Sequence, residues 1–131
     1  MKKIIVGFLA LVGAVLLFYF SRPFFLQEKK PTIKTITVYQ KILKQKTGHQ
    51  PFNEFSLELG KTSLELLKKT VPVKTKGEGK NAFVIMINNY EADSNKKEYW
   101  SFYVNGQYAQ VGAGSYILKN NDRIEWKIDT Y

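Results

Sequence analysis

The sequence predicts an α+β fold, in which a β-grasp-like mixed sheet with one short helix follows a single N-terminal transmembrane helix. Three observations lead to this prediction. An unbroken apolar run opens the chain, later segments alternate apolar and polar residues with the period of two typical of strands, and one capping box marks a helix between them. The order of two strands, one helix and then further strands is the order of a β-grasp domain.

The N-terminal segment has the pattern of a signal anchor. Lys2 and Lys3 precede an apolar run over Ile4–Phe20, and about 17 residues is the short end of what spans a bilayer. Aromatic residues end this run, where they suit a membrane interface and leave no small-x-small cleavage site. We therefore expect residues 1–21 to form an uncleaved transmembrane helix, with a cleaved signal peptide as the alternative.

The charge on each side of the apolar run predicts the orientation. Lys2 and Lys3 favour a cytoplasmic N-terminus, so the rest of the chain is expected outside the cell, on a single-pass protein of the cell membrane or, if the segment is cleaved, as a secreted protein. Residues 22–31 are framed by Arg22-Pro23 and Lys30-Pro31 and contain the polar stretch Gln27–Lys30, which is typical of a semi-extended tether. The folded domain is expected over residues 32–131.

The first half of this domain predicts two strands and the helix. Thr32–Ile42 is rich in β-branched residues, and Phe52–Leu59 alternates apolar and polar residues. Thr62 and Glu65 are spaced as a capping box, in which each side chain binds the other residue's backbone N–H. They predict a helix over residues 63–70.

The second half predicts strands separated by turns. Residues 73–81 contain Gly-Glu-Gly-Lys without the spacing of a phosphate-binding loop, so a mobile turn is expected there. Strands are expected over Phe83–Asn88, Glu98–Asn105, Gln107–Val111 and Arg123–Asp129, with a polar loop over residues 89–97 and a short strand over 116–118. Asn105-Gly106 predicts a type I′ hairpin turn, because both of its positions need positive φ.

The alternation in these segments also predicts the core. One face of the sheet is expected to pack against Leu64 and Leu67 of the helix. The side chains expected on this buried face are Ile36, Val38, Phe55, Leu57, Phe83, Ile85, Trp100, Phe102, Ile124 and Trp126.

Composition limits the chemistry that the chain can perform. It has 131 residues, a formal charge of +9, one histidine and no cysteine, which excludes disulfides, thiolate nucleophiles and cysteine metal sites. The basic charge favours anionic neighbours outside the cell, such as lipid headgroups or wall polymers. Because the lysines are scattered and form no block, nucleic acid is disfavoured as a partner.

No catalytic or metal-binding set emerges from the remaining residues. His49 lies in an expected turn beside Gly48, and a lone histidine there is normally a solvated side chain. Glu54 and Glu58 share a strand face with Ser56, where carboxylates are usually exposed to solvent. We expect no enzyme activity, no metal and no bound cofactor other than a candidate vitamin ligand.

The tyrosines near the last hairpin are the candidate binding residues. If Trp100 and Phe102 face the core, Tyr99 and Tyr103 face outward, and exposed tyrosines suit flat ligands, sugars or protein partners. Cross-strand pairing within an antiparallel sheet explains the same tyrosines equally well. The candidate ligand-binding set is Tyr99, Tyr103, Asn105, Tyr108, Gly112 and Gly114.

The last third of the chain resembles the transcobalamin C-terminal-like family. The resemblance lies in the stretches Tyr99–Gly106, Gly112–Tyr116 and Asp122–Trp126, and Gly60–Leu67 is similar to the start of the family's helix. It covers about Thr32–Lys127. It implies a β-grasp-like, extracellular domain, which in animal cobalamin carriers closes over the vitamin beside a larger helical domain.

The resemblance also implies a role at the membrane, since bacterial members are often membrane-anchored and some accompany vitamin transporters. We therefore expect a tethered extracellular module that binds a corrinoid or another vitamin, or that assists a transporter. The alternative is a structural or adhesive surface module that holds a partner protein or an anionic cell-wall polymer through its lysines.

Overall fold

The computed structural model describes residues 30–43 and 49–131 of the chain. Residues 32–131 form one compact unit. The expected transmembrane helix and most of the expected tether lie outside the described residues. Within the two described ranges, no helix has the length and apolar character needed to cross a membrane.

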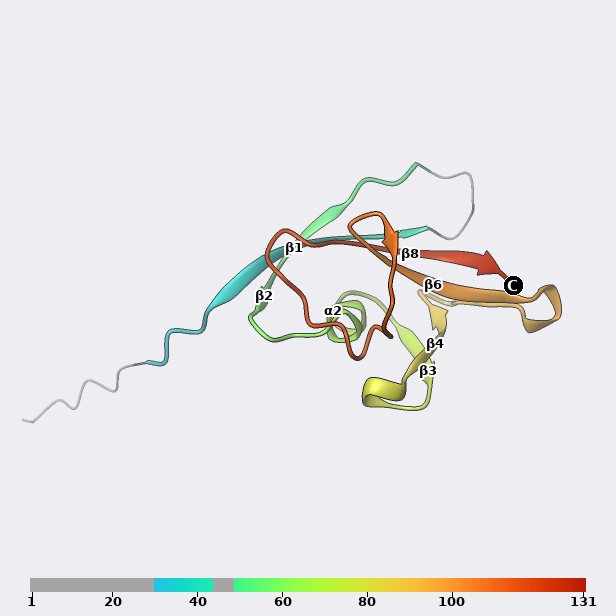
Figure 1. Cartoon of the computed structure of the whole chain (residues 1–131), viewed down its shortest axis with the longest axis horizontal. Helices are drawn as coiled ribbons and strands as arrows, with labels where there is room; N and C mark the ends of the chain where they lie inside the picture. Colours follow the sequence, from blue (N-terminus) through green and yellow to red (C-terminus); the bar gives the residue numbers. More distant parts are fainter. Residues whose placement is uncertain (1–29, 44–48) are drawn as a thin grey trace, which may run out of the picture. The chain divides into compact units, whose positions relative to one another are not determined.

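A five-stranded mixed sheet forms the larger part of the domain (Figure 1). In spatial order, its strands are β2 (Asn53–Glu58), β1 (Thr35–Leu43), β8 (Arg123–Thr130), β6 (Glu98–Val104) and β7 (Gln107–Tyr108). β1 and β8 run parallel, and the other neighbours are antiparallel. The expectation of an α+β fold with a mixed sheet and one α-helix is thereby confirmed for the described residues.

The helix α2 (Ser63–Thr70) begins and ends where the sequence predicts. The Thr62 N–H donates to Glu65 Oε2 at 2.7 Å, and the Glu65 N–H donates to Thr62 Oγ1 at 3.2 Å, which completes the capping box. Its last backbone bond runs from Val71 N–H to Leu67 C=O, directly before Pro72. The buried face of α2 carries Leu64, Leu66 and Leu67.

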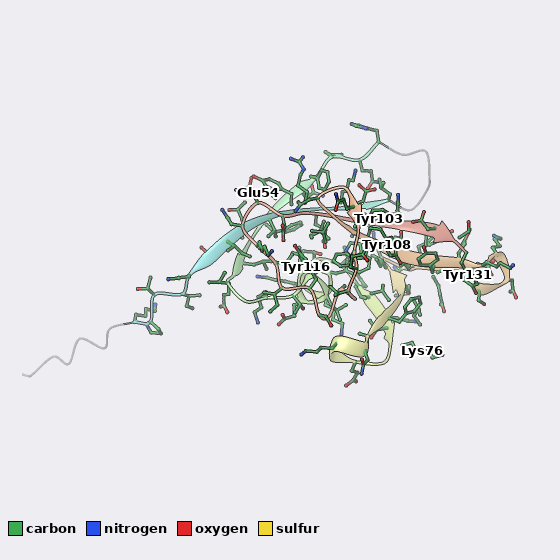
Figure 2. The ribbon with its side chains drawn as sticks, viewed as in Figure 1. Glu54, Lys76, Tyr103, Tyr108, Tyr116 and Tyr131 are labelled. Carbon is green, nitrogen blue, oxygen red and sulfur yellow. The ribbon has the colours of Figure 1, made fainter. Side chains whose placement is uncertain are left out.

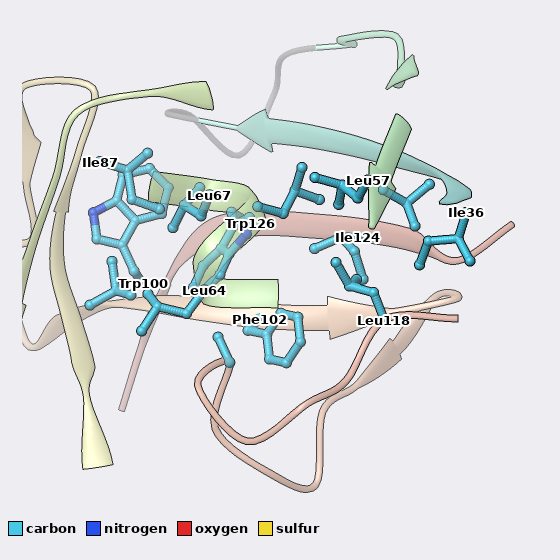
Figure 3. Close-up of a cluster of buried hydrophobic side chains, with 14 of the residues drawn as sticks. Ile36, Leu57, Leu64, Leu67, Ile87, Trp100, Phe102, Leu118, Ile124 and Trp126 are labelled. Carbon is cyan, nitrogen blue, oxygen red and sulfur yellow. The ribbon is translucent and has the colours of Figure 1, made fainter. Parts of the chain in front are cut away.

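The core lies between this helix and one face of the sheet (Figure 3). Trp126 of β8 is almost completely buried and stacks on Phe102 with the ring centroids 5.1 Å apart. Ile36, Val38, Leu57, Trp100 and Ile124 are also buried, as the alternation predicts.

The prediction of which side chains face the core is wrong for the strand after residue 82. Phe83 is 52% exposed and Ile85 is half-buried, whereas Val84, Met86 and Ile87 are buried. The five residues from Phe83 to Ile87 are all apolar, so their sequence contains no alternation that could fix which side faces the core.

A second sheet of three antiparallel strands accounts for this correction. It has the order β3 (Val73–Lys76), β4 (Phe83–Ile87) and β5 (Tyr90–Glu91), where a single sheet was expected. Residues 73–76 are therefore a strand, and only the segment after them turns, with the 3₁₀ helix η1 (Gly79–Asn81). A second 3₁₀ helix, η2 (Ser94–Lys96), follows β5.

Trp100 joins the two sheets. Its indole Nε1–H donates to the carbonyl of Tyr90 in β5 at 3.2 Å, and the two rings meet edge to face. Residues of β4 and β6 belong to the same buried cluster. The expected short strands near the C-terminus are smaller than predicted, because β7 ends at Tyr108 and residues 116–118 contribute a single bridge between Ile117 and Thr62.

Candidate functional site

The β6–β7 hairpin, which carries the candidate residues, has the predicted turn. Asn105 and Gly106 both have positive φ, of 51° and 84°, as a type I′ turn requires. β6 and β7 pair through Tyr103 with Tyr108 and through Val104 with Gln107. The turn therefore places Tyr103 and Tyr108 side by side.

The side chain of Asn105 is committed to holding a second turn. Its Nδ2 donates to Asp122 Oδ1 at 3.0 Å, and its Oδ1 accepts from the Arg123 N–H at 2.9 Å. Asp122 is only 4% exposed and accepts two further hydrogen bonds on its other oxygen, from Tyr116 Oη and the Lys119 N–H. Asn105 thus positions the hairpin rather than offering a free amide.

Tyr116 belongs to this network and has a strongly shifted pKa. Burial of its ring is the largest cause, and the hydrogen bond to Asp122 is the second; together they raise the pKa of Tyr116 to about 12. No sequence pattern marks Asp122 as the residue that organises this network. The only signal was the polar turn Asn120-Asn121-Asp122, which indicates a turn without indicating what its side chains bind.

The loop with Gly112 and Gly114 covers the start of α2. The carbonyls of Ala113 and Tyr116 accept from the N–H groups of Leu64 and Ser63, each at 3.0 Å. These bonds satisfy helix donors that the first turn would otherwise leave free.

The two glycines of this loop face different surroundings. A Cβ on Gly114 would lie 2.0 Å from the carbonyl oxygen of Gly79 in η1, whereas a Cβ on Gly112 would make an ordinary 3.7 Å contact with Lys80. Gly114 is therefore required by packing, and neither a free amide nor a ligand is needed to explain it.

A hollow of about 420 Å³ opens between the hairpin and this loop. Tyr108 and Val111 on its wall are 51% and 49% exposed, so an aromatic and an apolar side chain border the same hollow. Figure 2 shows Tyr108 and Tyr116 on neighbouring parts of the chain. The lining residues are Val104, Asn105, Gln107, Tyr108, Ala109, Gln110, Val111 and Tyr116.

The other two candidate tyrosines lie on the outer face of the sheet. Tyr103 donates its hydroxyl to Asp129 Oδ2 at 2.9 Å and lies under the Lys127 ammonium, with Nζ 3.9 Å from the ring centroid. Its ring meets Tyr108 edge to face at 5.4 Å. Tyr99 packs against Tyr131. Burial of the Tyr99 side chain is the largest cause that raises its pKa, and the neighbouring Tyr108 is the second.

The structure thus divides the predicted set of six. Asn105 and Tyr108 line the hollow, Tyr99 and Tyr103 share the outer face with Tyr108, and Gly112 and Gly114 shape the adjoining loop. Among the residues that the structure describes, no group of three or more His, Cys, Asp or Glu side chains is arranged to hold a metal ion.

The fold and the hairpin agree with the resemblance to the transcobalamin C-terminal-like family. Residues 60–130 match the family described as "Domain of unknown function (DUF4430)". The chain belongs to this family, so the resemblance in its last third is confirmed. No protein of curated function matches the sequence.

Solved structures share the fold. Haptocorrin in complex with Cbi superposes with a TM-score of 0.63 at 20% identity, over 75% of this chain and 26% of the haptocorrin chain. A protein of Ruminococcus gnavus ATCC 29149, named as a proposed metal binding protein, superposes with a TM-score of 0.55 at 21% identity, over 75% of this chain and 98% of its own. This chain therefore spans about a quarter of haptocorrin, and the likeness at these identities is one of fold.

Proposed function

We propose that this chain is a non-enzymatic binding module that is tethered outside the cell and presents its β-grasp-like domain to a small ligand. The hollow beside the β6–β7 hairpin carries this proposal. It is walled by the exposed side chains of Tyr108 and Val111, while the network around Asp122 holds its shape. A rigid wall with exposed aromatic and apolar side chains favours a flat, partly apolar ligand.

The ligand we propose is a corrinoid or another vitamin of similar size. The observation in support is that haptocorrin, whose structure is a complex with Cbi, contains the same fold. Because this chain matches only 26% of haptocorrin, the hairpin would form one side of such a site. A transporter subunit or another surface protein is the partner that would supply the other side.

The tether is the second part of the proposal. Residues 1–21 combine two lysines with an apolar run, and residues 22–31 would then hold the domain close to the membrane. The test is extraction of the full-length protein from membranes with alkaline carbonate. Retention in the pellet supports an anchor, and release of the full-length chain contradicts it.

Equilibrium dialysis of the full chain in detergent micelles with cyanocobalamin tests the ligand. We expect saturable binding that Tyr108→Ala weakens about tenfold, because the substitution removes an aromatic wall worth roughly 1.4 kcal/mol. Tyr131→Ala is the matched control, since Tyr131 is also exposed and lies outside the hollow. Absence of saturable binding at tens of micromolar would remove the corrinoid.

A surface module without a small ligand is the second candidate. Exposed lysines occur on α2, β3 and η1, and Figure 2 labels one of them, Lys76 of β3. Retention of the protein on an anionic wall polymer at low salt, lost at about 0.5 M salt, would favour this function. The exposed lysines of these three elements are Lys68, Lys69, Lys74, Lys76 and Lys80.

A further inference from the structure

A groove runs between β2 and α2 and shares no lining residue with the hairpin hollow. Two hollows of about 590 and 390 Å³ form it and adjoin at Leu57 and Lys69. β2 lines it from Asn53 to Glu58, and α2 lines it from Glu65 to Thr70. The groove therefore follows the whole length of one strand.

β2 is an edge strand, and its outer edge is free within the described residues. The Leu59 N–H donates to the Lys34 carbonyl at 2.8 Å, one step beyond the Thr35–Glu58 pair. Because hydrogen-bonded pairs alternate in an antiparallel ladder, the backbone groups of Leu57 and Leu59 point toward β1. Those of Glu54, Ser56 and Glu58 therefore point away from the sheet, as an added strand would require.

The hydrogen bonds on the other edge of β1 agree with this alternation of inward and outward backbone groups. The Tyr39 N–H donates to the Asp122 carbonyl, and the Thr37 carbonyl accepts from the Asn121 N–H. Odd-numbered residues of β1 thus bond toward β8, which leaves its even-numbered residues to bond β2.

The side chains beside this edge are apolar toward α2 and acidic on the opposite face. Phe55 and Leu57 of β2 and Leu66 of α2 line the groove together with Val71. Glu54, Ser56 and Glu58 are exposed and alternate with these apolar residues along β2, so their side chains leave the strand on its other face, and Ser56 and Glu58 also border the groove.

The floor and the rim of the groove are polar. Gln40 is 2% exposed, and its Nε2 donates to Thr70 Oγ1 at 2.9 Å, but no described residue donates to its Oε1. On the rim, Lys68 and Lys69 are exposed and form no ion pair with described residues. Glu65 of α2 also lines the groove, but it is paired with Lys61 at 3.1 Å. An inserted segment would therefore meet the positive charge of the two lysines on the side of α2 and negative charge on the outer face.

We propose that the free edge of β2 binds an extended peptide segment of a partner protein by strand addition. The backbone of the peptide pairs with Glu54, Ser56 and Glu58. Its alternate side chains are apolar or acidic where they enter the groove beside Lys69, and basic or hydroxyl-bearing where they lie beside the two glutamates. This site is separate from the hairpin hollow, so it does not depend on the proposed vitamin ligand.

The experiment measures fluorescence anisotropy of the labelled hexapeptide Thr-Val-Lys-Glu-Thr-Val with the full chain in detergent micelles. We expect saturable binding with a Kd below about 1 mM. Exchanging the lysine and glutamate of the peptide should weaken binding about threefold, since both charges then face like charges. A peptide of the same sequence that is N-methylated at the alternate residues whose N–H groups would face β2 should not bind, because it cannot complete the ladder.

Two variants of one residue separate backbone from side-chain effects. Ser56→Pro removes an outward-facing N–H that the β1–β2 ladder does not use, so it should abolish peptide binding. Ser56→Ala keeps that N–H and should bind as the wild type does. Cyanocobalamin binding by both variants is measured in parallel. Loss of peptide binding can then be distinguished from loss of the proposed vitamin binding.

Several outcomes would overturn the strand-addition proposal. They are absence of saturable peptide binding by the wild type, equal binding of the N-methylated peptide, and equal loss in Ser56→Ala and Ser56→Pro. Light scattering, which measures the oligomeric state, provides a further outcome that would overturn the proposal. If the wild type were a dimer and Ser56→Pro a monomer, the edge of β2 would bind a second copy of the chain.

Discussion

Asp122 shows how one buried residue can fix the geometry of a candidate site without lining it. It accepts hydrogen bonds from Asn105, Tyr116 and Lys119, and the Asp122 carbonyl also accepts from Tyr39 of β1. The hairpin, the covering loop and the central strand β1 are thereby joined at one residue, the first two through its side chain and β1 through its backbone. Satisfying a buried carboxylate in this way is what makes its burial tolerable.

Tyr116 provides a prediction at the same scale. Folding raises its pKa from 10.0 to about 12, so the folded state binds the phenolic proton more tightly than the unfolded state. Its contribution to stability is therefore fully present below pH 10 and lost as the pH rises through 12. Urea unfolding at pH 9 and pH 11.5 should show a smaller loss of stability for Tyr116→Phe than for the wild type. Equal losses would contradict the assignment.

At the scale of elements, local signals were sufficient wherever one short pattern determines a structure. The capping box at Thr62 predicted α2, and Asn105-Gly106 predicted the hairpin turn. β3 was missed because four residues with alternating lysines do not distinguish a strand from a loop. Asn88 and Asn89, which make the turn between β4 and β5 at positive φ, were assigned to other elements.

The candidate site was less predictable than the fold for a related reason. The six candidate ligand-binding residues were predicted together because they lie near one hairpin in the sequence. Which of them share a surface depends on side-chain direction and on packing between distant segments. Tyr99 and Tyr103 do not line the hollow, although Tyr103 contacts Tyr108, and Gly114 is explained by η1, which lies more than thirty residues earlier in the chain. Such contacts leave no local periodicity.

The packing of the covering loop on η1 gives the prediction for elements. Gly114→Ala should destabilise the domain by about 2 kcal/mol or more, because the new Cβ meets backbone atoms of Gly79, which can move only with the loop. Gly112→Ala is the matched control, since its Cβ makes an ordinary contact, and it should change stability by less than about 1 kcal/mol. Thermal unfolding of both variants measures the difference, and equal effects would exclude this packing as the reason for Gly114.

At the scale of the whole molecule, the two sheets are expected to unfold as one unit. Val84 and Ile87 of the smaller sheet belong to the buried cluster that contains Trp100 and Trp126 of the larger sheet. The indole of Trp100 also binds the backbone of β5 directly. A core shared in this way favours a single cooperative transition.

Ile87→Ala tests this cooperativity from the smaller sheet. Ile87 is completely buried, so its truncation should cost about 3 kcal/mol. The loss should appear in the urea transition of tryptophan fluorescence, although both tryptophans lie on the other sheet. Phe83→Ala is the control in the same strand; because Phe83 is 52% exposed, it should cost less than about 1 kcal/mol. If Ile87→Ala left the tryptophan transition unchanged while amides of β3, β4 and β5 exchanged rapidly, the smaller sheet would be an independent unit, and the proposed single core would be wrong.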